Sequence, residues 1–219
     1  MSFRISISRP TWIFLTLGVL VQIVTFSLLS EDNPWSLVSG ILGIFSVVLG
    51  AQANILTFVF GFAQVVTYTY LCCVERFYAE IAMNIYYFVT MIYGAYCWRN
   101  RLVQHSLQVQ TRCLSPKFLP LISVMIIMVS LLVGWLLSRY TDDPQPYLDS
   151  FTTVPAIVAQ LLMILAYREQ WYLWLIVDVL AILMWLRAEN YCMAVQYVFW
   201  CANCIYGYIY WTRHLNEHT

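Results

Sequence analysis

The sequence predicts an all-α integral membrane protein with eight transmembrane helices. Hydrophobic residues make up 62% of the 219 residues and charged residues 10%, whereas charged residues approach a quarter of an ordinary soluble domain. The apolar residues gather in runs of about twenty, long enough as a helix to cross a hydrocarbon core of about 30 Å. The formal net charge is zero and no dense basic cluster is present, so we expect no nucleic-acid partner.

Eight apolar segments follow one another, separated by short breaks with turn-forming or charged residues. The first segment follows Arg4 and Arg9, but it is long for a signal peptide and no small-residue cleavage site follows it, so we expect it to be retained. The one long break, residues 99–116, is polar and basic. The expected helices span residues 11–30, 34–51, 53–73, 77–98, 117–138, 148–167, 169–186 and 190–211.

The distribution of Lys and Arg predicts the orientation. With the N-terminus inside, the cytoplasmic side holds eight basic residues and the outer side three, which by the positive-inside rule places both termini in the cytoplasm of a multi-pass plasma-membrane protein. The inner set is Arg4, Arg9, Arg99, Arg101, Arg112, Lys117, Arg168 and Arg213, and the outer set is Arg76, Arg139 and Arg187.

An internal repeat predicts how the helices are grouped. A shift of 113 residues aligns Tyr78 with Tyr191 and Trp98 with Trp211, and three segment starts recur at the same spacing in both halves. Two parallel three-helix bundles joined by a linker helix are a known transporter plan, with the substrate site where the halves meet. The expected organisation is an N-terminal helix (1–33), a first bundle (34–98), a basic cytoplasmic loop with the linker helix (99–146), a second bundle (147–211) and a cytoplasmic tail (212–219).

Polar and aromatic side chains at helical spacing predict a pocket. Trp171, Trp174 and Asp178 share one face of the seventh segment. An ionisable group at mid-bilayer costs about 2.5–3.5 kcal/mol on insertion scales, so it normally faces protein or a watery cavity. The last segment carries amides on one face, and the repeat aligns that face with polar residues of the fourth segment. The predicted substrate-binding residues are Asn84, Tyr87, Thr90, Trp174, Asp178, Trp185, Gln196, Trp200 and Asn203.

Structural explanations for some of these side chains stay open. Amides such as Gln196 and Asn203 also serve as hydrogen-bond partners between membrane helices. Tryptophans near helix ends form interfacial belts, which is the simpler account of Trp171 and the expected role of Trp98 and Trp211. The glycines of the repeat, Gly94 and Gly207, are expected to permit close approach of helices.

Cysteines and histidines predict no metal or cofactor site. Most cysteines lie in or at the ends of apolar runs, where a free thiol packs as a small hydrophobe, and Cys201 and Cys204 have no second ligand pair nearby. His214 and His218 lie in the C-terminal segment, where we expect a solvated tail. Because the apolar segments contain no Ser/His pair and no histidine cluster, no catalytic residues are predicted and a membrane enzyme is disfavoured. A non-transporting scaffold would not explain matched polar faces in both halves.

The chain resembles the PnuC family of vitamin transporters. The resemblance covers residues 34–211 and rests on the W-x-x-W-x-x-x-D pattern ending at Asp178, the Tyr-Gly-x-x-x-Trp endings at 93–98 and 206–211, and the eight-segment plan. It implies a SWEET-like core of three plus one plus three helices and a homotrimer in the bacterial inner membrane. The implied function is facilitated diffusion of nicotinamide riboside, a form of vitamin B3 used in NAD biosynthesis, with cytoplasmic phosphorylation trapping the substrate.

The residues fit this substrate but leave an alternative open. The pyridinium of nicotinamide riboside is a flat cation that suits a tryptophan face and a nearby Asp178, and its carboxamide matches an Asn or Gln amide. Thiamine is also an aromatic cation, and related members carry thiamine or riboflavin. Because Asp178 is the one clear acid of the deep core, which holds no histidine or lysine, we expect downhill uniport without ion coupling.

Overall fold

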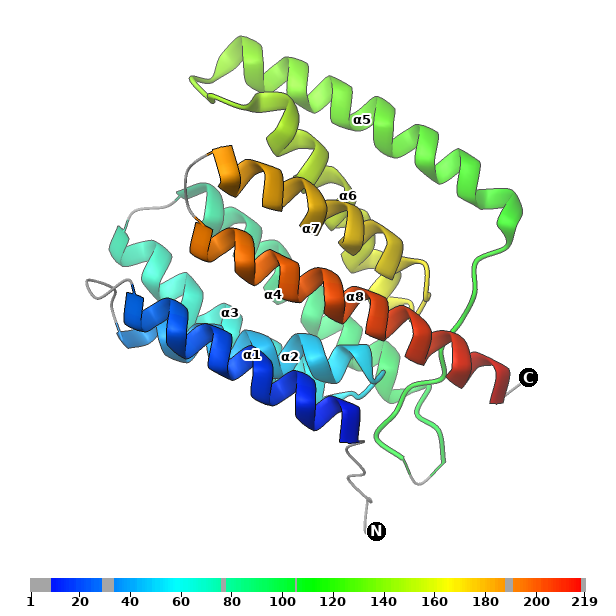
Figure 1. Cartoon of the computed structure of the whole chain (residues 1–219). Coiled ribbons are helices and arrows are strands. Elements are labelled where there is room, and N and C mark those ends of the chain that lie inside the picture. The colour runs from blue at the N-terminus through cyan, green and yellow to red at the C-terminus, as the bar shows by residue number, and fades with distance from the viewer. Residues whose placement is uncertain (1–8, 29–33, 76–77, 105, 188–190, 218–219) are drawn as a thin grey trace. The chain divides into compact units, whose positions relative to one another are not determined.

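A computed structural model of the chain describes residues 9–28, 34–75, 78–104, 106–187 and 191–217. Within these ranges the chain forms eight α-helices and one short 3-10 helix, with no β-strand (Figure 1). The predicted all-α membrane fold is therefore confirmed. The helices are α1 (Arg9–Leu28), α2 (Pro34–Ala51), α3 (Leu56–Glu75), α4 (Tyr78–Arg99), η1 (Pro116–Phe118), α5 (Leu119–Tyr140), α6 (Pro146–Ile164), α7 (Gln170–Arg187) and α8 (Tyr191–Glu217).

The helices differ in how apolar they are. Among the described residues, α1, α2, α3, α5 and α6 are long and apolar enough to cross a membrane by length and composition, and the apolar part of α7, Gln170–Met184, is shorter. The helices outside this group, α4, α7 and α8, are those on which the sequence analysis places the substrate-binding residues. Polar side chains that lower the hydropathy of a membrane helix normally face protein or a cavity, so these three helices are where a site is expected.

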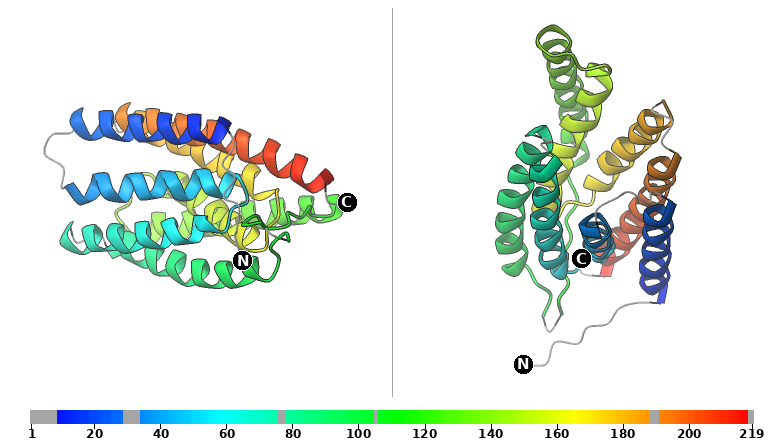
Figure 2. Two further views of the ribbon diagram at one scale, coloured as in Figure 1. Left: turned by 90° about the horizontal axis from the view of Figure 1, so that it is seen from below. Right: turned by 90° about the vertical axis from the view of Figure 1, so that its left-hand side faces the viewer.

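Two compact units make up the chain. The first contains α1 to α4 with the loop that follows, together with residues 164–166 and the end of α8 from Tyr210. In this unit α1 packs on α2, α2 on α3 and α3 on α4, and these helices run side by side (Figure 2). The second unit contains α5, α6, α7 and α8 up to Ile209. In it, α5 meets α6 at Gly134, where an added Cβ would lie 2.6 Å from the Tyr147 ring.

The repeat is visible in the backbone at the turns that precede α3 and α7. Ala53 (φ 53°) and Ala166 (φ 60°), 113 residues apart, are the two non-glycine residues with positive φ in the described chain. Each is followed by a residue whose N–H reaches back to a helix carbonyl, Asn54 N to Leu49 O at 3.0 Å and Tyr167 N to Leu162 O at 2.9 Å. These are the left-handed residue and the 6→1 hydrogen bond of a Schellman helix end. The duplication is confirmed at this turn.

The same equivalence extends to side-chain packing. A Cβ added to Gly94 would lie 2.6 Å from the Phe58 ring, and one added to Gly207 would lie 2.6 Å from the Trp171 ring. The shift of 113 residues converts the first pair into the second. Both glycines therefore permit an aromatic ring to lie against the helix backbone, as the sequence predicts, and the two halves use the same contact.

The predicted interfacial role of the helix-end tryptophans is wrong. Trp98 and Trp211 are completely buried, with ring centroids 5.8 Å apart, and Trp211 Nε1 donates to Gly50 O at 3.1 Å. Trp171 is also buried, because its ring covers Gly207. The sequence position at a helix end suggested a belt, but the repeat makes Trp98 and Trp211 equivalent residues that meet each other inside the first unit.

The predicted solvated tail is also wrong where it is described. α8 continues to Glu217 instead of ending near residue 211. His214 is buried, and its ring stacks on Tyr210 one turn earlier, with centroids 6.1 Å apart. The polar composition after Trp211 concealed this packing, because this end of α8 is itself part of the first unit. His218 lies outside the described residues.

Candidate functional site

A buried carboxylate lies at the middle of α7. Asp178 is 7% exposed, and its Oδ2 accepts a hydrogen bond from Cys204 Sγ on α8 at 3.2 Å. A thiol is a weak donor, and no ion pair to Asp178 exists in the described part of the chain. A carboxylate at membrane depth without a basic partner is costly. This arrangement suits a carboxylate that receives its countercharge from a cationic ligand.

A buried amide belongs to the residue that precedes Cys204 on α8. Asn203 is completely buried, and within the described residues neither its Nδ2 nor its Oδ1 has a hydrogen-bond partner. A buried polar group without a partner typically costs about 1–3 kcal/mol. The alternative in which Asn203 links two helices has no hydrogen bond to support it here. The amide can instead offer a donor and an acceptor to a ligand.

The remaining second-unit residues of the predicted site lie on the same two helices. Trp174 on α7 and Gln196 and Trp200 on α8 are half-buried. On α8, Gln196 and Trp200 lie at helical spacing from the buried amide of Asn203 and share a face with it. Trp185 belongs to α7, but its side chain falls outside what the structure describes. Among the predicted residues whose side chains are described, α7 and α8 thus carry one buried acid, two amides and two half-buried indole rings.

The first-unit residues of the predicted site form a separate group on α4. Asn84 and Thr90 are buried, and Tyr87 is half-buried beside Tyr86, with ring centroids 5.5 Å apart. Thr90 Oγ1 donates to Tyr87 O at 3.0 Å, so this hydroxyl is used within its own helix turn. The Thr90 hydroxyl and the Tyr87 ring thus have partners on α4 itself, unlike the amide of Asn203.

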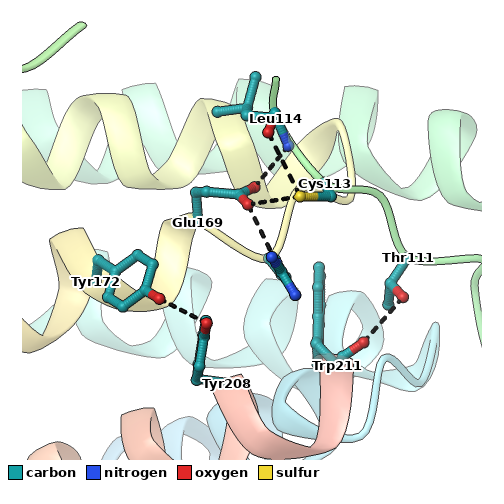
Figure 3. A network of polar contacts seen from close by, with 8 residues as sticks. Thr111, Cys113, Leu114, Glu169, Tyr172, Tyr208 and Trp211 are labelled. Atoms are coloured by element: carbon teal, nitrogen blue, oxygen red, sulfur yellow. Dashed lines mark hydrogen bonds and ion pairs between the residues drawn. The ribbon is translucent and has the colours of Figure 1, made fainter. Parts of the chain in front are cut away.

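A polar network fixes the start of α7 (Figure 3). The buried Glu169 carboxylate accepts hydrogen bonds from Leu114 N at 3.0 Å, Cys113 Sγ at 3.2 Å and Arg168 Nε at 3.2 Å. Burial, followed by the hydrogen bond to Glu169, raises the pKa of the Cys113 thiol, which therefore stays neutral at physiological pH. The network ties residues 112–114 to the first turn of α7 and so sets the position of that helix.

Besides the Cys204–Asp178 hydrogen bond, a pair of tyrosines links α7 to α8. The Tyr172 and Tyr208 hydroxyls are hydrogen-bonded at 2.5 Å, and their ring centroids are 4.7 Å apart (Figure 3). The Arg168 guanidinium lies over the Tyr208 ring, 5.8 Å from its centroid. Together with the contact between Gly207 and the Trp171 ring, these interactions join the N-terminal end of α7 to the C-terminal half of α8.

Sequence reasoning missed two residues here. Glu169 and Gln170 lie at the predicted helix boundary, where polar residues are usually solvated, yet both are buried. Neither amide atom of Gln170 has a partner in the described chain. The available signal was the spacing of four residues that places Gln170, Trp174 and Asp178 on one helical face.

Comparison with known proteins identifies the family. A family model described as nicotinamide mononucleotide transporter matches residues 33–213. The chain belongs to this transporter family. A relative from Haemophilus influenzae, named nicotinamide riboside transporter PnuC, is 31% identical over 92% of this chain and 88% of its own. A relative of the same name from Neisseria mucosa is 29% identical over 96% of this chain and 83% of its own.

A solved structure agrees with this assignment. The crystal structure of the vitamin B3 transporter PnuC is similar to this transporter with a TM-score of 0.81, 28% sequence identity, and coverage of 98% of this chain and 95% of the other. The resemblance seen in the Trp-x-x-Trp-x-x-x-Asp pattern is therefore confirmed over essentially the whole chain. The protein is a multi-pass membrane protein of a transporter family.

Proposed function

We propose that this transporter imports nicotinamide riboside across the bacterial inner membrane by facilitated diffusion. The observation that carries the proposal is the α7–α8 pair, in which Asp178 has a thiol donor and the Asn203 amide has no partner among the described residues. The substrate supplies what these groups lack: a pyridinium cation and a carboxamide with both donor and acceptor. The names of the relatives from two organisms support the same substrate.

Each residue has a proposed role. Asp178 offsets the pyridinium charge, and Trp174 offers a ring face worth about 0.5–2 kcal/mol to a cation. Asn203 pairs with the carboxamide, and Gln196 offers further hydrogen bonds. Trp185 and Trp200 complete the aromatic lining. The contribution of Asn84, Tyr87 and Thr90 on α4 is proposed from the repeat, which aligns α4 with α8.

The charge of the site favours the riboside over the mononucleotide in the family description. Recognition of a phosphate normally uses Arg or Lys, or a helix N-terminus. The sequence contains no Lys or Arg between residues 169 and 186 or between 191 and 212, so these parts of α7 and α8 offer an acid but no base to a phosphate. Thiamine, also an aromatic cation, is the second candidate because Asp178 and the tryptophans would suit its charged ring, although it has no carboxamide for Asn203 to pair with.

The proposal includes uniport, with net uptake driven by a cytoplasmic kinase that phosphorylates the substrate. Asp178 is the one acid at the middle of α7, and no His, Lys or Arg accompanies it in the α7 and α8 segments named above, so it serves the cationic substrate and not a proton relay. Both termini lie in the cytoplasm, as the basic residues indicate, and the chain assembles as a homotrimer, as the family resemblance implies. The protein is a transporter and not an enzyme.

Uptake by purified protein in sealed liposomes tests the function. Nicotinamide riboside should equilibrate across the membrane, and competition with thiamine, riboflavin and nicotinamide mononucleotide should be weak. Enclosing a riboside kinase with ATP should convert equilibration into continued accumulation. Accumulation above the outside concentration without kinase, driven by an imposed proton or sodium gradient, would contradict uniport, and preferred uptake of thiamine would replace the substrate.

A further inference from the structure

Gln170 is a buried amide to which no function has been assigned above. It is the first residue of α7, its side chain is 1% exposed, and neither Nε2 nor Oε1 has a hydrogen-bond partner among the described residues. An amide can donate two hydrogen bonds and accept two. Leaving these groups unpaired in a buried position typically costs about 1–3 kcal/mol for each. A side chain under that penalty is suited to a partner that the protein itself does not supply.

The repeat shows that the fold does not require this amide. The equivalent of Gln170 in the first half is Thr57, which is equally buried but fully used: Thr57 Oγ1 donates to Ser46 O at 2.8 Å, and Ser46 Oγ donates to Thr57 O at 2.9 Å. The equivalent of Ser46 in the second half is Ala159, which has no polar side chain. The second half therefore has a longer amide where the first half has a satisfied hydroxyl pair.

The helix geometry points to the kind of ligand. Gln170, Trp174 and Asp178 follow one another at intervals of four residues, so they lie on one face of α7. Eight residues of α-helix rise about 12 Å, which is too far for one small aromatic ring to contact both ends. A ring joined to a sugar is longer, and its hydroxyl groups both donate and accept hydrogen bonds, as an amide does.

We propose that Gln170 binds the ribose hydroxyls of the substrate and so makes the site specific for a riboside over the free base. In this arrangement α7 holds the aromatic base near Asp178 and Trp174, and the sugar extends one to two turns toward Gln170. The inference rests on the proposed function, because it takes nicotinamide riboside as the ligand. It adds a specificity residue that neither the sequence pattern nor the family resemblance supplied.

The test is a calorimetric comparison of wild type and Gln170→Met with nicotinamide riboside and its 2′-, 3′- and 5′-deoxy analogues. Gln170→Met should weaken riboside binding by roughly ten- to hundredfold, the loss expected for one or two hydrogen bonds. One of the deoxy analogues should bind wild type more weakly than the riboside does but should lose nothing further in the variant, since the interacting group is already absent.

Thermal unfolding of the same ligand-free proteins separates binding from folding. Methionine has a similar shape and removes the unpaired amide, so Gln170→Met should unfold at the same temperature as wild type or higher. Gln145→Met is the matched control, because Gln145 also has a buried Oε1 without a partner in the described chain but precedes α6. That variant should bind the riboside as wild type does.

Two results would overturn the inference while leaving the proposed function intact. In the first, Gln170→Met binds nicotinamide riboside as tightly as wild type, which would mean that water satisfies the amide. In the second, each of the three deoxy analogues binds more weakly than the riboside by the same factor in wild type and in the variant, so that no sugar hydroxyl is coupled to Gln170. If wild type binds no nicotinamide riboside, the proposed function itself fails, and the inference fails with it.

Discussion

The two halves of the chain share a backbone turn but satisfy its polar groups differently. At Ala53 and at Ala166 the chain leaves a helix through an alanine in the left-handed conformation. The loop after α4 forms a backbone hydrogen bond with the residues that follow each alanine. Ile55 N donates to Leu107 O, and its equivalent Arg168 N donates to Arg112 O, each at 2.9 Å. One loop thus serves two equivalent turns. The duplicated backbone is retained in both halves, which leaves the side chains around it free to differ.

The difference lies in what the first turn of the following helix buries. In the first half it buries the Ser46–Thr57 pair, whose hydrogen bonds stay within the protein. In the second half the buried residues are Glu169, which precedes α7 and is held by the 112–114 segment, and Gln170, which has no partner among the described residues. Satisfied groups stabilise a fold, whereas unpaired buried groups reduce stability and offer binding. We interpret the first half as the more structural of the two and the second as the more specialised for ligand binding.

The largest expected effect concerns the contact that both halves share. Gly94→Val and Gly207→Val each place side-chain carbons where a Cβ alone would lie 2.6 Å from an aromatic ring. Overpacking of this kind costs about 1–3 kcal/mol, occasionally more. Both variants should lower the unfolding temperature in detergent by similar amounts, because the two contacts are equivalent.

Gly43→Ala is the control for that prediction. A Cβ at Gly43 would lie 3.5 Å from the Gln64 side chain, an ordinary contact. Replacing a helical glycine with alanine gains about 0.5–1 kcal/mol, so this variant should be at least as stable as wild type. A large loss at Gly94 with none at Gly207 would contradict the equivalence of the two halves.

A slightly smaller effect is expected at the two turns. A β-branched side chain in the left-handed region is strained by about 1–3 kcal/mol, so Ala53→Val and Ala166→Val should both destabilise the protein. Replacement of either alanine by glycine removes the backbone strain and should change the unfolding temperature little. Chemical or thermal unfolding of the four variants measures this, and tolerance of valine at both positions would refute the described turn geometry.

These turns illustrate what the sequence could and could not predict. Helix number and approximate position follow from apolar runs, because in a membrane every backbone polar group must be paired within a helix. The left-handed alanines carry no sequence signal, since glycine is the usual residue at a Schellman helix end. Only the 113-residue repeat linked Ala53 with Ala166, and the loop contacts that hold both turns join residues far apart in the chain.

The burial of polar residues in the candidate site was predicted in part, for a related reason. Asp178 and Asn203 were identifiable because a carboxylate and an amide are unusual inside apolar helices. Glu169 and Gln170 were missed, since polar residues at a helix end are ordinarily solvated and their burial depends on the 112–114 segment. The burial of Trp98 and Trp211 was missed for the same cause: helix-end tryptophans resemble interfacial anchors until their partners in the fold are known.

A smaller effect distinguishes the two halves. Thr57→Val removes the hydroxyl that donates to Ser46 O and leaves that carbonyl without this donor. The loss of stability should be about 1–2 kcal/mol, in the range for a buried hydrogen bond, with unchanged affinity for nicotinamide riboside. Thermal unfolding and calorimetric titration of the same sample measure the two quantities. A loss of affinity with no loss of stability would show that the first half also contributes its turn to the ligand.

The central claim is that α7 and α8 bind the substrate through buried groups that the fold leaves unpaired. Titration of nicotinamide riboside into purified wild type and Asn203→Leu tests it most directly. Leucine is similar in size and removes the unpaired amide, so the ligand-free variant should be at least as stable as wild type. Its affinity should fall roughly ten- to hundredfold. Wild-type affinity in a folded Asn203→Leu protein would show that the amide does not contact the substrate and would contradict the account.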